Sequence, residues 1–196
     1  MEIVLASRNK KKAAEIERIL AGSPITVLTL DDFPNCPDVE EDADTFDGNA
    51  LKKARAIAAC TGRAAFSDDS GLEVEALSGA PGVYSARYAG PNANDADNLQ
   101  KLLAAMQDIP EERRAARFVC AIAFVQPNGD EHVFWGYAEG AIGREPKGVS
   151  GFGYDPVFYP SGHARTFAEM TATEKDAMSH RRKALEKLAE FLGFLF

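Results

Sequence analysis

The chain has few of the residues that build metal centres, disulfide frameworks or membrane segments. Its 196 residues include three cysteines, three histidines and one tryptophan. Cys36, Cys60 and Cys120 are an odd number at unrelated spacings, which favours free thiols in a reducing compartment over a disulfide framework or a zinc site. The longest apolar run, residues 118–125, is far too short to cross a bilayer, and the first ten residues lack a signal-peptide pattern. We therefore expect a soluble, cytoplasmic protein.

Positive charge is also scarce. The formal net charge is −8, from 30 acidic and 22 basic residues. This balance disfavours broad electrostatic binding of DNA, RNA or anionic lipid, but it is compatible with a local basic site for one small polyanion. A hydrophobic content of 45% in 196 residues is typical of one globular domain, which we expect to span residues 1–196.

Hydrophobic periodicity predicts strands interleaved with helices, and hence an α/β fold with a mixed sheet. Strands are expected at 2–6, 25–30, 63–71, 72–77, 117–125 and 131–140. Helices are expected from about residue 9 to 20, and at 50–60, 95–107 and 171–192, the last as one helix or as a turn and a helix capped at Ser179. Three long loops separate these elements, an acidic one at 31–49 and glycine-rich ones at 78–94 and 143–162, the last around a short aromatic strand.

The expected first helix carries cations at its unfavourable end. Its cap is Ser7 or Asn9, and Lys10, Lys11 and Lys12 follow in the first turn. Each lysine there costs about 0.3–1 kcal/mol because the helix dipole is positive at that end. A triphosphate bound at this strand-to-helix turn would compensate the cost. Three solvated surface lysines are the alternative, and this stretch alone does not decide between the two.

An acidic pair follows an apolar run in FSDDSG. Asp68 and Asp69 are expected where a buried strand ends in a turn, and carboxylates there are costly unless they bind something. Neighbouring strand residues point to opposite faces, so one of the two is expected to face a site, as a Mg²⁺ ligand or a general base. A turn in which Asp and Ser bond their own backbone is the alternative.

Two later segments also suit a nucleotide. GFGYDP at 151–156 alternates glycines with aromatics, so that backbone and a ring can approach a flat ligand. EKDAMSHRR places His180 and Arg181 at another helix start, and two such cationic starts in one acidic protein favour an anion site over solvated surface charge.

Six motifs taken in order resemble those of the non-standard purine nucleoside triphosphate pyrophosphatases, the inosine triphosphate pyrophosphatase or XTP/dITP diphosphatase family. They are SRNKKKAAE, TFDGNALKKARA, SDDSGLEVEAL, GAPGVYSARYAG, GFGYDPVF and EKDAMSHRRKAL. The resemblance implies a two-lobed α/β fold with a long mixed central sheet flanked by helices, a nucleotide-binding cleft between the lobes, and a homodimer. It also implies Mg²⁺-dependent hydrolysis of ITP, dITP and XTP to the monophosphate and pyrophosphate, which keeps deaminated purines out of DNA and RNA.

The resemblance further implies the site residues. The catalytic acid falls on Asp69, which also holds the metal together with Glu41 or, less favourably, Glu40. Many family members carry a glutamate where this chain has Gly48, so the metal ligands stay open, as does the choice between Mg²⁺ and Mn²⁺. Substrate-binding positions fall on Ser7, Arg8, Asn9, Lys10, Lys11, Lys12, Lys53, Ser70, Phe152, Gly153, Tyr154, Asp155, Lys175, His180 and Arg181.

Three other functions were weighed against this one. A relative acting on modified pyrimidine or methylated nucleotides, as in the septum-inhibitor-like family, is disfavoured by GFGYDP and SHRR. A nucleotide sensor without catalysis would need a broken acidic site, whereas Asp69 and Glu41 are present. A single-strand nucleic-acid binder would need a basic groove, which the net charge of −8 disfavours.

Overall fold

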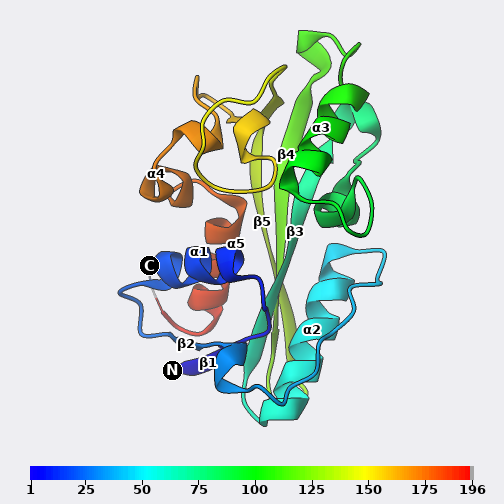
Figure 1. Cartoon of the computed structure of the whole chain (residues 1–196). Coiled ribbons are helices and arrows are strands. Elements are labelled where there is room, and N and C mark those ends of the chain that lie inside the picture. Colours follow the sequence, from blue (N-terminus) through cyan, green and yellow to red (C-terminus); the bar gives the residue numbers. More distant parts are fainter. Residues whose placement is uncertain (195–196) are drawn as a thin grey trace. The chain divides into compact units, whose positions relative to one another are not determined.

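The computed structural model describes residues 1–194, in which strands and helices alternate as expected (Figure 1). The strands are β1 (Glu2–Leu5), β2 (Thr26–Leu28), β3 (Ala65–Val74), β4 (Ala115–Val125), β5 (Glu131–Ile142) and β6 (Phe158–Pro160). The α-helices are α1 (Lys10–Leu20), α2 (Phe46–Thr61), α3 (Asp95–Ala105), α4 (Ala172–Asp176) and α5 (His180–Phe191).

The six strands form one sheet in the order β2-β1-β3-β4-β5-β6. β1 pairs in parallel with β2 and β3, whereas β5 and β6 are antiparallel. The sheet is therefore mixed, and the predicted α/β class is confirmed. Along the described part of the chain, 1–194, no helix is both long and apolar enough to span a membrane.

The chain divides into two compact units. Unit 1 consists of Met1–Asp69, Cys120–Gly136 and the C-terminal segment from Arg181, and unit 2 of Ser70–Val119 and Tyr137–His180. A single functional domain over residues 1–196 stays a prediction, and its residues 195 and 196 lie outside the described residues.

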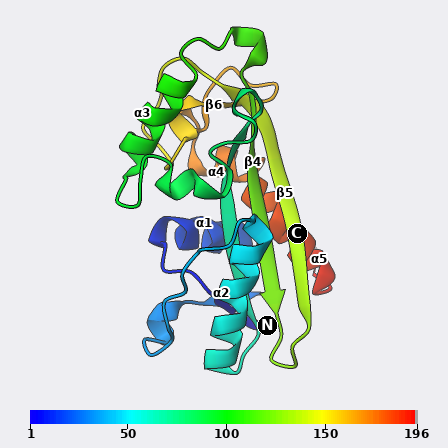
Figure 2. The same cartoon turned by 90° about the vertical axis from the view of Figure 1, so that its right-hand side faces the viewer.

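In unit 1, helices cover both faces of the sheet (Figure 1, Figure 2). Ile3 of β1 packs with Ile16 of α1 and Leu185 of α5, whereas the next residue, Val4, packs with Ala54 of α2. This alternation follows from the pleat, because successive side chains of a strand point to opposite faces. β1 and the parts of β3 and β4 in unit 1 are consequently buried on both sides, whereas β2 is an edge strand and is partly exposed.

Unit 2 has its own core beneath α3. Leu102 of α3 and Met106, which caps the C-terminal end of α3, are fully buried and belong to the same cluster as Phe118 of β4 and Phe158 of β6. The rings of these two phenylalanines lie 4.7 Å apart. The helix expected at 95–107 is thereby confirmed, with Leu102 on its buried face.

Local sequence signals place several element ends correctly. The side chain of Asn9 caps α1, and Gly62 ends α2 in the left-handed conformation with φ 65°. Thr171 and Glu174 form the expected capping box at the start of α4. The tail contains two helices, α4 and α5, which settles the alternative left open by its pattern.

The prediction of a strand that ends in a turn at FSDDSG is wrong. β3 continues from Ala65 to Val74, so the expected strands 63–71 and 72–77 are one strand, followed by a 3₁₀ turn at Glu75–Leu77. Asp68 and Asp69 therefore lie inside a buried strand. Their burial is tolerated because cations from distant parts of the chain lie beside them. A local sequence pattern cannot predict those cations, because they are far away in sequence.

The prediction of free thiols is also wrong for two of the three cysteines. Cys36 and Cys60 form a disulfide with their Cα atoms 5.8 Å apart, whereas Cys120 is a buried free thiol. The fold brings the loop that contains Cys36 alongside the last turn of α2, so cysteines 24 positions apart in sequence meet in space.

Candidate active site

The strand-to-helix turn before α1 is built by side chains that bond its own backbone. Ser7 Oγ accepts the N–H of Asn9 at 3.2 Å, and Asn9 Oδ1 accepts the N–H groups of Lys11 and Lys12 at 3.1 and 3.2 Å. The side chains of Lys10 and Lys11 are exposed, whereas the Lys12 side chain turns inward and its Nζ lies 3.1 Å from Asp68 Oδ2. One of the three lysines is thus placed by a buried carboxylate, and the other two extend into solvent.

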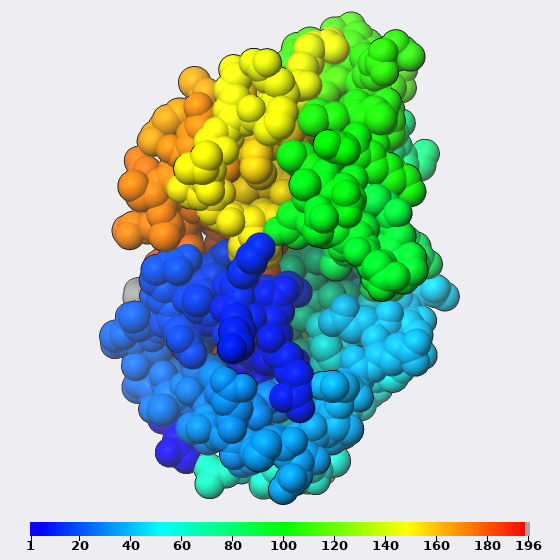
Figure 3. All heavy atoms as spheres, in the orientation of Figure 1, coloured from blue at the N-terminus to red at the C-terminus, as the bar shows by residue number. Residues whose placement is uncertain are grey.

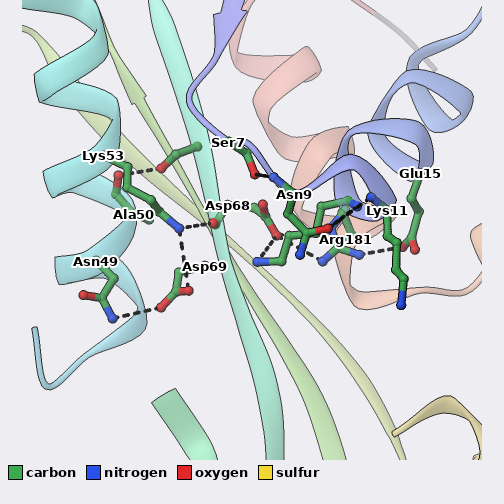
Figure 4. Close-up of polar contacts among 12 residues, drawn as sticks. Ser7, Asn9, Lys11, Glu15, Asn49, Ala50, Lys53, Asp68, Asp69 and Arg181 are labelled. Atoms are coloured by element: carbon green, nitrogen blue, oxygen red, sulfur yellow. Dashed lines mark hydrogen bonds and ion pairs between the residues drawn. The ribbon is translucent and has the colours of Figure 1, made fainter. Parts of the chain in front are cut away.

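β3 presents its two aspartates to opposite faces (Figure 4). Asp68 points toward α1 and Arg181, and Asp69 points toward Asn49 and Lys53 of α2. The expected divergence of neighbouring strand residues is confirmed. The two carboxylates therefore have different partners and different chemistry.

Asp68 belongs to a buried network of ion pairs. Arg181 donates from Nη2 to Asp68 Oδ2 at 3.0 Å and from Nη1 to Glu15 Oε1 at 2.7 Å. These three residues are at most 3% exposed. Burial alone would raise the pKa of Asp68, but Lys12 and Arg181 outweigh it and hold this pKa well below its usual range. Asp68 is therefore a fixed anion that places two cations, and it does not exchange protons near neutral pH.

Asp69 has a different environment, made by α2. Its Oδ2 accepts a hydrogen bond from Asn49 Nδ2 at 3.2 Å, and its Oδ1 lies 3.8 Å from Lys53 Nζ. Burial raises the pKa of Asp69 to about 6, with a smaller contribution from Glu41, while Lys53 and Lys12 oppose the rise. A carboxyl that ionises near pH 6 is suited to accept a proton at neutral pH.

Lys53 joins Asp69 to the acidic loop. Its Nζ donates to Glu41 and, at 2.7 Å, to the backbone carbonyl of Asp68. Burial alone would raise the pKa of Glu41, but Lys53 outweighs it and this pKa is lowered. One ammonium group thus contacts two carboxylates, Glu41 and Asp69, that come from different segments.

This donor set fits a divalent cation that is shared with a substrate. Within residues 1–194, no cluster of three or more His, Cys, Asp or Glu side chains could hold a metal. Mg²⁺, however, takes one or two protein carboxylates and fills its other positions with phosphate oxygens and water. Glu41 and Asp69 converge on one cation already, the ammonium of Lys53, whereas Glu40 is exposed to solvent. The geometry favours Glu41 over Glu40.

In unit 2, Asp155 organises the glycine-rich segment. Its Oδ2 accepts the N–H of Phe152 at 2.9 Å and a proton of Lys175 Nζ at 2.7 Å. The Lys175 Nζ also lies 4.8 Å from the centre of the Phe152 ring. A Cβ on Gly151, which has φ +74°, would lie 2.0 Å from Asp155 Oδ2, so glycine is required there.

The aromatic residues predicted to meet the base differ in exposure. Phe152 is partly exposed, whereas Tyr154 is 4% exposed and its hydroxyl donates to the carbonyl of Ser85 at 2.8 Å. The His180 ring is buried and stacks on Phe118 with centroids 4.8 Å apart. Phe152 is therefore the most exposed aromatic ring of this set, whereas Tyr154 is a core residue.

The structure brings several predicted site residues together within each unit. In unit 1 one connected set of contacts includes Lys12, Glu41, Lys53, Asp69 and Arg181, and in unit 2 another includes Phe152, Asp155 and Lys175. Ser70 follows Asp69 on β3 and is partly exposed.

Sequence reasoning missed three residues of the unit 1 set, Glu15, Asn49 and Asp68, as partners of other site residues. Two of the three had a visible signal: Asp68 belongs to the acidic pair after an apolar run, and Glu15 lies beside Ile16 on the apolar face of a helix.

Comparisons with known proteins give a consistent result. The model of the Ham1 family matches residues 3–191. A protein of Geobacter sulfurreducens named dITP/XTP pyrophosphatase is 50% identical over 192 residues, which cover 98% of this chain and 96% of the relative. A second protein of that name, from Desulforamulus reducens, is 49% identical over 196 residues, or 100% of this chain and 98% of the relative.

Solved structures agree with the sequence relatives. A HAM1 protein from Coxiella burnetii superposes with a TM-score of 0.89 at 47% identity, and the Staphylococcus aureus Ham1 protein with 0.87 at 40%. Each comparison covers 98% of both chains. These matches confirm the resemblance carried by the six motifs. The chain therefore belongs to the Ham1 family.

Proposed function

We propose that this protein hydrolyses the non-standard purine nucleotides dITP, XTP and ITP to the nucleoside monophosphate and pyrophosphate. The names of relatives that are about half identical over nearly their whole length support this reaction. The observation that carries the proposal is Asp69, a buried carboxyl with a pKa raised to about 6 that shares the Lys53 ammonium with Glu41. Such a group is suited to general-base chemistry beside a bound phosphate.

The start of α1 binds the phosphates. The helix dipole and its backbone N–H groups favour an anion there. Lys10 and Lys11 add charge from solvent, while Lys12, held by Asp68, adds charge at a defined position. These cations stabilise the negative charge that develops on the leaving pyrophosphate.

Asp69 orients a water molecule and accepts its proton as the water attacks the α-phosphorus. Asn49 holds Asp69 through Oδ2, and Lys53 holds its other oxygen less closely. Glu41 and Asp69 would hold Mg²⁺, which would neutralise charge on the phosphate oxygens. Lys53 contacts both carboxylates and keeps them close to each other.

Base recognition is assigned to Phe152–Asp155, Lys175, His180 and Arg181. The partly exposed ring of Phe152 offers a stacking surface, and donors to the 6-oxo group would reject adenine, because a buried donor facing an amino group is left unpaired. Sites of this kind discriminate by roughly 10⁴–10⁵. Arg181 gives three of its donor bonds to Glu15 and Asp68, so we assign the 6-oxo contact to His180 and to backbone groups near it.

The proposal has four further parts, which all rest on the family resemblance. They are a requirement for Mg²⁺, a homodimer, a cytoplasmic location and one functional domain over residues 1–196. Light scattering coupled to size-exclusion chromatography tests the dimer. A mass near 42 kDa, twice the 21.2 kDa of one chain, supports it, and a mass near that of one chain refutes it.

The reaction is tested by product analysis with ITP, XTP, dITP, GTP, ATP and dUTP side by side, with Mg²⁺ and with EDTA. We expect monophosphate and pyrophosphate from the first three and little turnover of the others. Diphosphate and phosphate as products would refute the mechanism. Tight ITP binding without turnover would support a nucleotide sensor instead.

A further inference from the structure

The acidic loop is fastened along α2 at several points. We call residues 33–45 the acidic strap, which Figure 3 shows on the visible surface of unit 1, in blue next to the cyan of α2. Its bonds to α2 run in antiparallel order, from Cys36 with Cys60, through Glu41 with Lys53 and Asp42 with Lys52, to Ala43 with Asn49. The disulfide is thus the anchor of one end, and the Ala43–Asn49 hydrogen bonds anchor the other.

The disulfide end of the strap also contacts the strand-to-helix turn before α1, which we call the phosphate turn because the proposal places the phosphates there. Arg8 Nη2 donates to the carbonyl oxygen of Cys36 at 3.0 Å, and Arg8 Nε donates to Asp38 Oδ1 at 2.5 Å. Arg8 lies between Ser7 and Asn9, which build the turn before α1. The Arg8–Asp38 pair is solvent-exposed, and such pairs by themselves contribute little. The position of Arg8 therefore depends on the contacts that fix the segment around Cys36. These are the disulfide, the hydrogen bond from Cys36 N–H to the carbonyl of Phe33 at 3.1 Å, and the packing of Cys36 in the core of unit 1. Of these, the disulfide is the covalent contact, and reduction removes it.

The two residues of the disulfide differ in exposure. Cys36 is 5% exposed, whereas Cys60, in the last turn of α2, is exposed. Cys60 is therefore the half of the disulfide on the solvent side, from which an incoming thiolate would approach. Cys120 is fully buried, and burial raises the pKa of its thiol, so it does not compete for this chemistry. Disulfides in reducing compartments are usually transient, catalytic or redox-sensing rather than structural.

We propose that Cys36–Cys60 is a reversible redox site that sets the affinity for the triphosphate through the strap and Arg8. This inference rests on the proposed function for its kinetic consequence, although not for its structural one. A dithiol supplies the electrons: its thiolate attacks the sulfur of Cys60, and Cys36 leaves as a thiolate and takes up a proton. The second thiolate of the dithiol then closes its own disulfide and releases Cys60, so two electrons and two protons pass to the protein.

Reduction frees the end of the strap that holds Arg8, and it leaves the other end in place. Glu41 keeps its bond to Lys53, and Ala43 keeps both hydrogen bonds to Asn49. The phosphate turn therefore loses the fixed contacts of Arg8 with Cys36 and Asp38, whereas the contacts of Lys53 with Glu41 and Asp69 remain. We expect the KM for ITP to rise at least threefold while kcat changes by less than twofold.

Thiol counting and hydrogen exchange test the structural part without substrate. Air-oxidised protein should expose one alkylatable thiol after denaturation, from Cys120, and three after treatment with dithiothreitol. Reduction should then speed amide exchange in residues 33–40 and in residues 6–12, and leave residues 43–49 unchanged. Three thiols in the oxidised sample, or unchanged exchange in residues 6–12, would overturn the proposal whatever the enzyme hydrolyses.

Kinetics of oxidised and reduced wild-type protein test the functional part. The variant Cys36→Ser/Cys60→Ser should have the higher KM with or without dithiothreitol, and Cys120→Ser should respond to the reductant as wild type does. If the double variant does not fold, the wild-type comparison decides alone. An equal KM in both redox states would overturn the proposal. No ITP hydrolysis in either state would instead refute the proposed function, and the redox site would then be tested by hydrogen exchange alone.

Discussion

Replacing Asp69 with asparagine should remove turnover and still make the metal-free protein more stable at pH 8. Burial raises the pKa of Asp69 from its ordinary value of 3.8 to about 6, so the folded state binds this proton more tightly than the unfolded state. The ionised carboxylate therefore costs stability above pH 6, and the cost vanishes below about pH 4, where both states are protonated. The gap between the two pKa values corresponds to about 3 kcal/mol.

The variant keeps the contacts that matter for folding. An asparagine at position 69 can still accept the hydrogen bond from Asn49, and Lys53 retains Glu41 and the carbonyl of Asp68. We therefore expect Asp69→Asn to gain about 1–3 kcal/mol at pH 8 and close to nothing near pH 4. Turnover should fall by roughly 10²–10⁴, the usual worth of a general base, while nucleotide binding persists.

The neighbouring aspartate, Asp68, provides a matched control, because its replacement should change stability in the opposite direction. Although burial opposes it, Lys12 and Arg181 hold the pKa of Asp68 well below 3.8, so this carboxylate stabilises the fold throughout the range from pH 5 to 8. Asp68→Asn should cost about 3–5 kcal/mol, because it leaves buried cations without their partner. Its effect should not vary over that range of pH.

Urea unfolding at pH 8, 6 and 4.5, with EDTA and without nucleotide, measures both variants. The reasoning is refuted if Asp69→Asn is less stable than wild type at pH 8, or if its gain is as large at pH 4.5 as at pH 8. It is refuted as well if both asparagine variants change stability in the same direction, because the surroundings lower the pKa of Asp68 and raise that of Asp69.

Three further predictions follow from the contacts of the site. Lys53→Met should raise the pKa of Asp69 further, so the acidic limb of the pH profile of kcat/KM should move to higher pH; an unmoved limb would contradict the assignment of Asp69. Asn9→Asp should keep the helix cap, so its free energy of unfolding should lie within about 0.5 kcal/mol of wild type, but its KM for ITP should rise at least tenfold. Asn9→Ala should lose the cap and about 1 kcal/mol of unfolding free energy. Cys36→Ser/Cys60→Ser should lose about 3 kcal/mol in urea unfolding, since the bridge closes a loop with a sequence separation of 24, and a loss below about 1 kcal/mol would argue against the bridge.

Local chemistry made much of the fold predictable. Asn9, Gly62 and the Thr171–Glu174 box act within a few residues of the ends that they define, so their effect is visible in a single sequence. The hairpin between β4 and β5 is of the same kind, because Gly129 supplies the positive φ that its turn needs.

Long-range pairing explains what sequence reasoning missed. The continuation of β3 through its aspartates depends on Arg181, which lies 113 positions from Asp68 in sequence. The disulfide likewise depends on how the strap folds back along α2, and the spacing of Cys36 and Cys60 carries no information about that path. In the candidate site, local patterns indicated a role for the three lysines and for the acidic pair, and the resemblance selected Lys12 and Asp69 among them. The contacts of Glu15 with Arg181 and of Asn49 with Asp69 came from the structure.

Hydrolysis of ITP in water enriched in ¹⁸O is the most direct test of the central claim. If Asp69 directs water to the α-phosphorus, mass spectrometry should find one ¹⁸O atom in inosine monophosphate and none in pyrophosphate. Label in pyrophosphate, or in inorganic phosphate released with the diphosphate, would place the attack on another phosphorus and contradict the account.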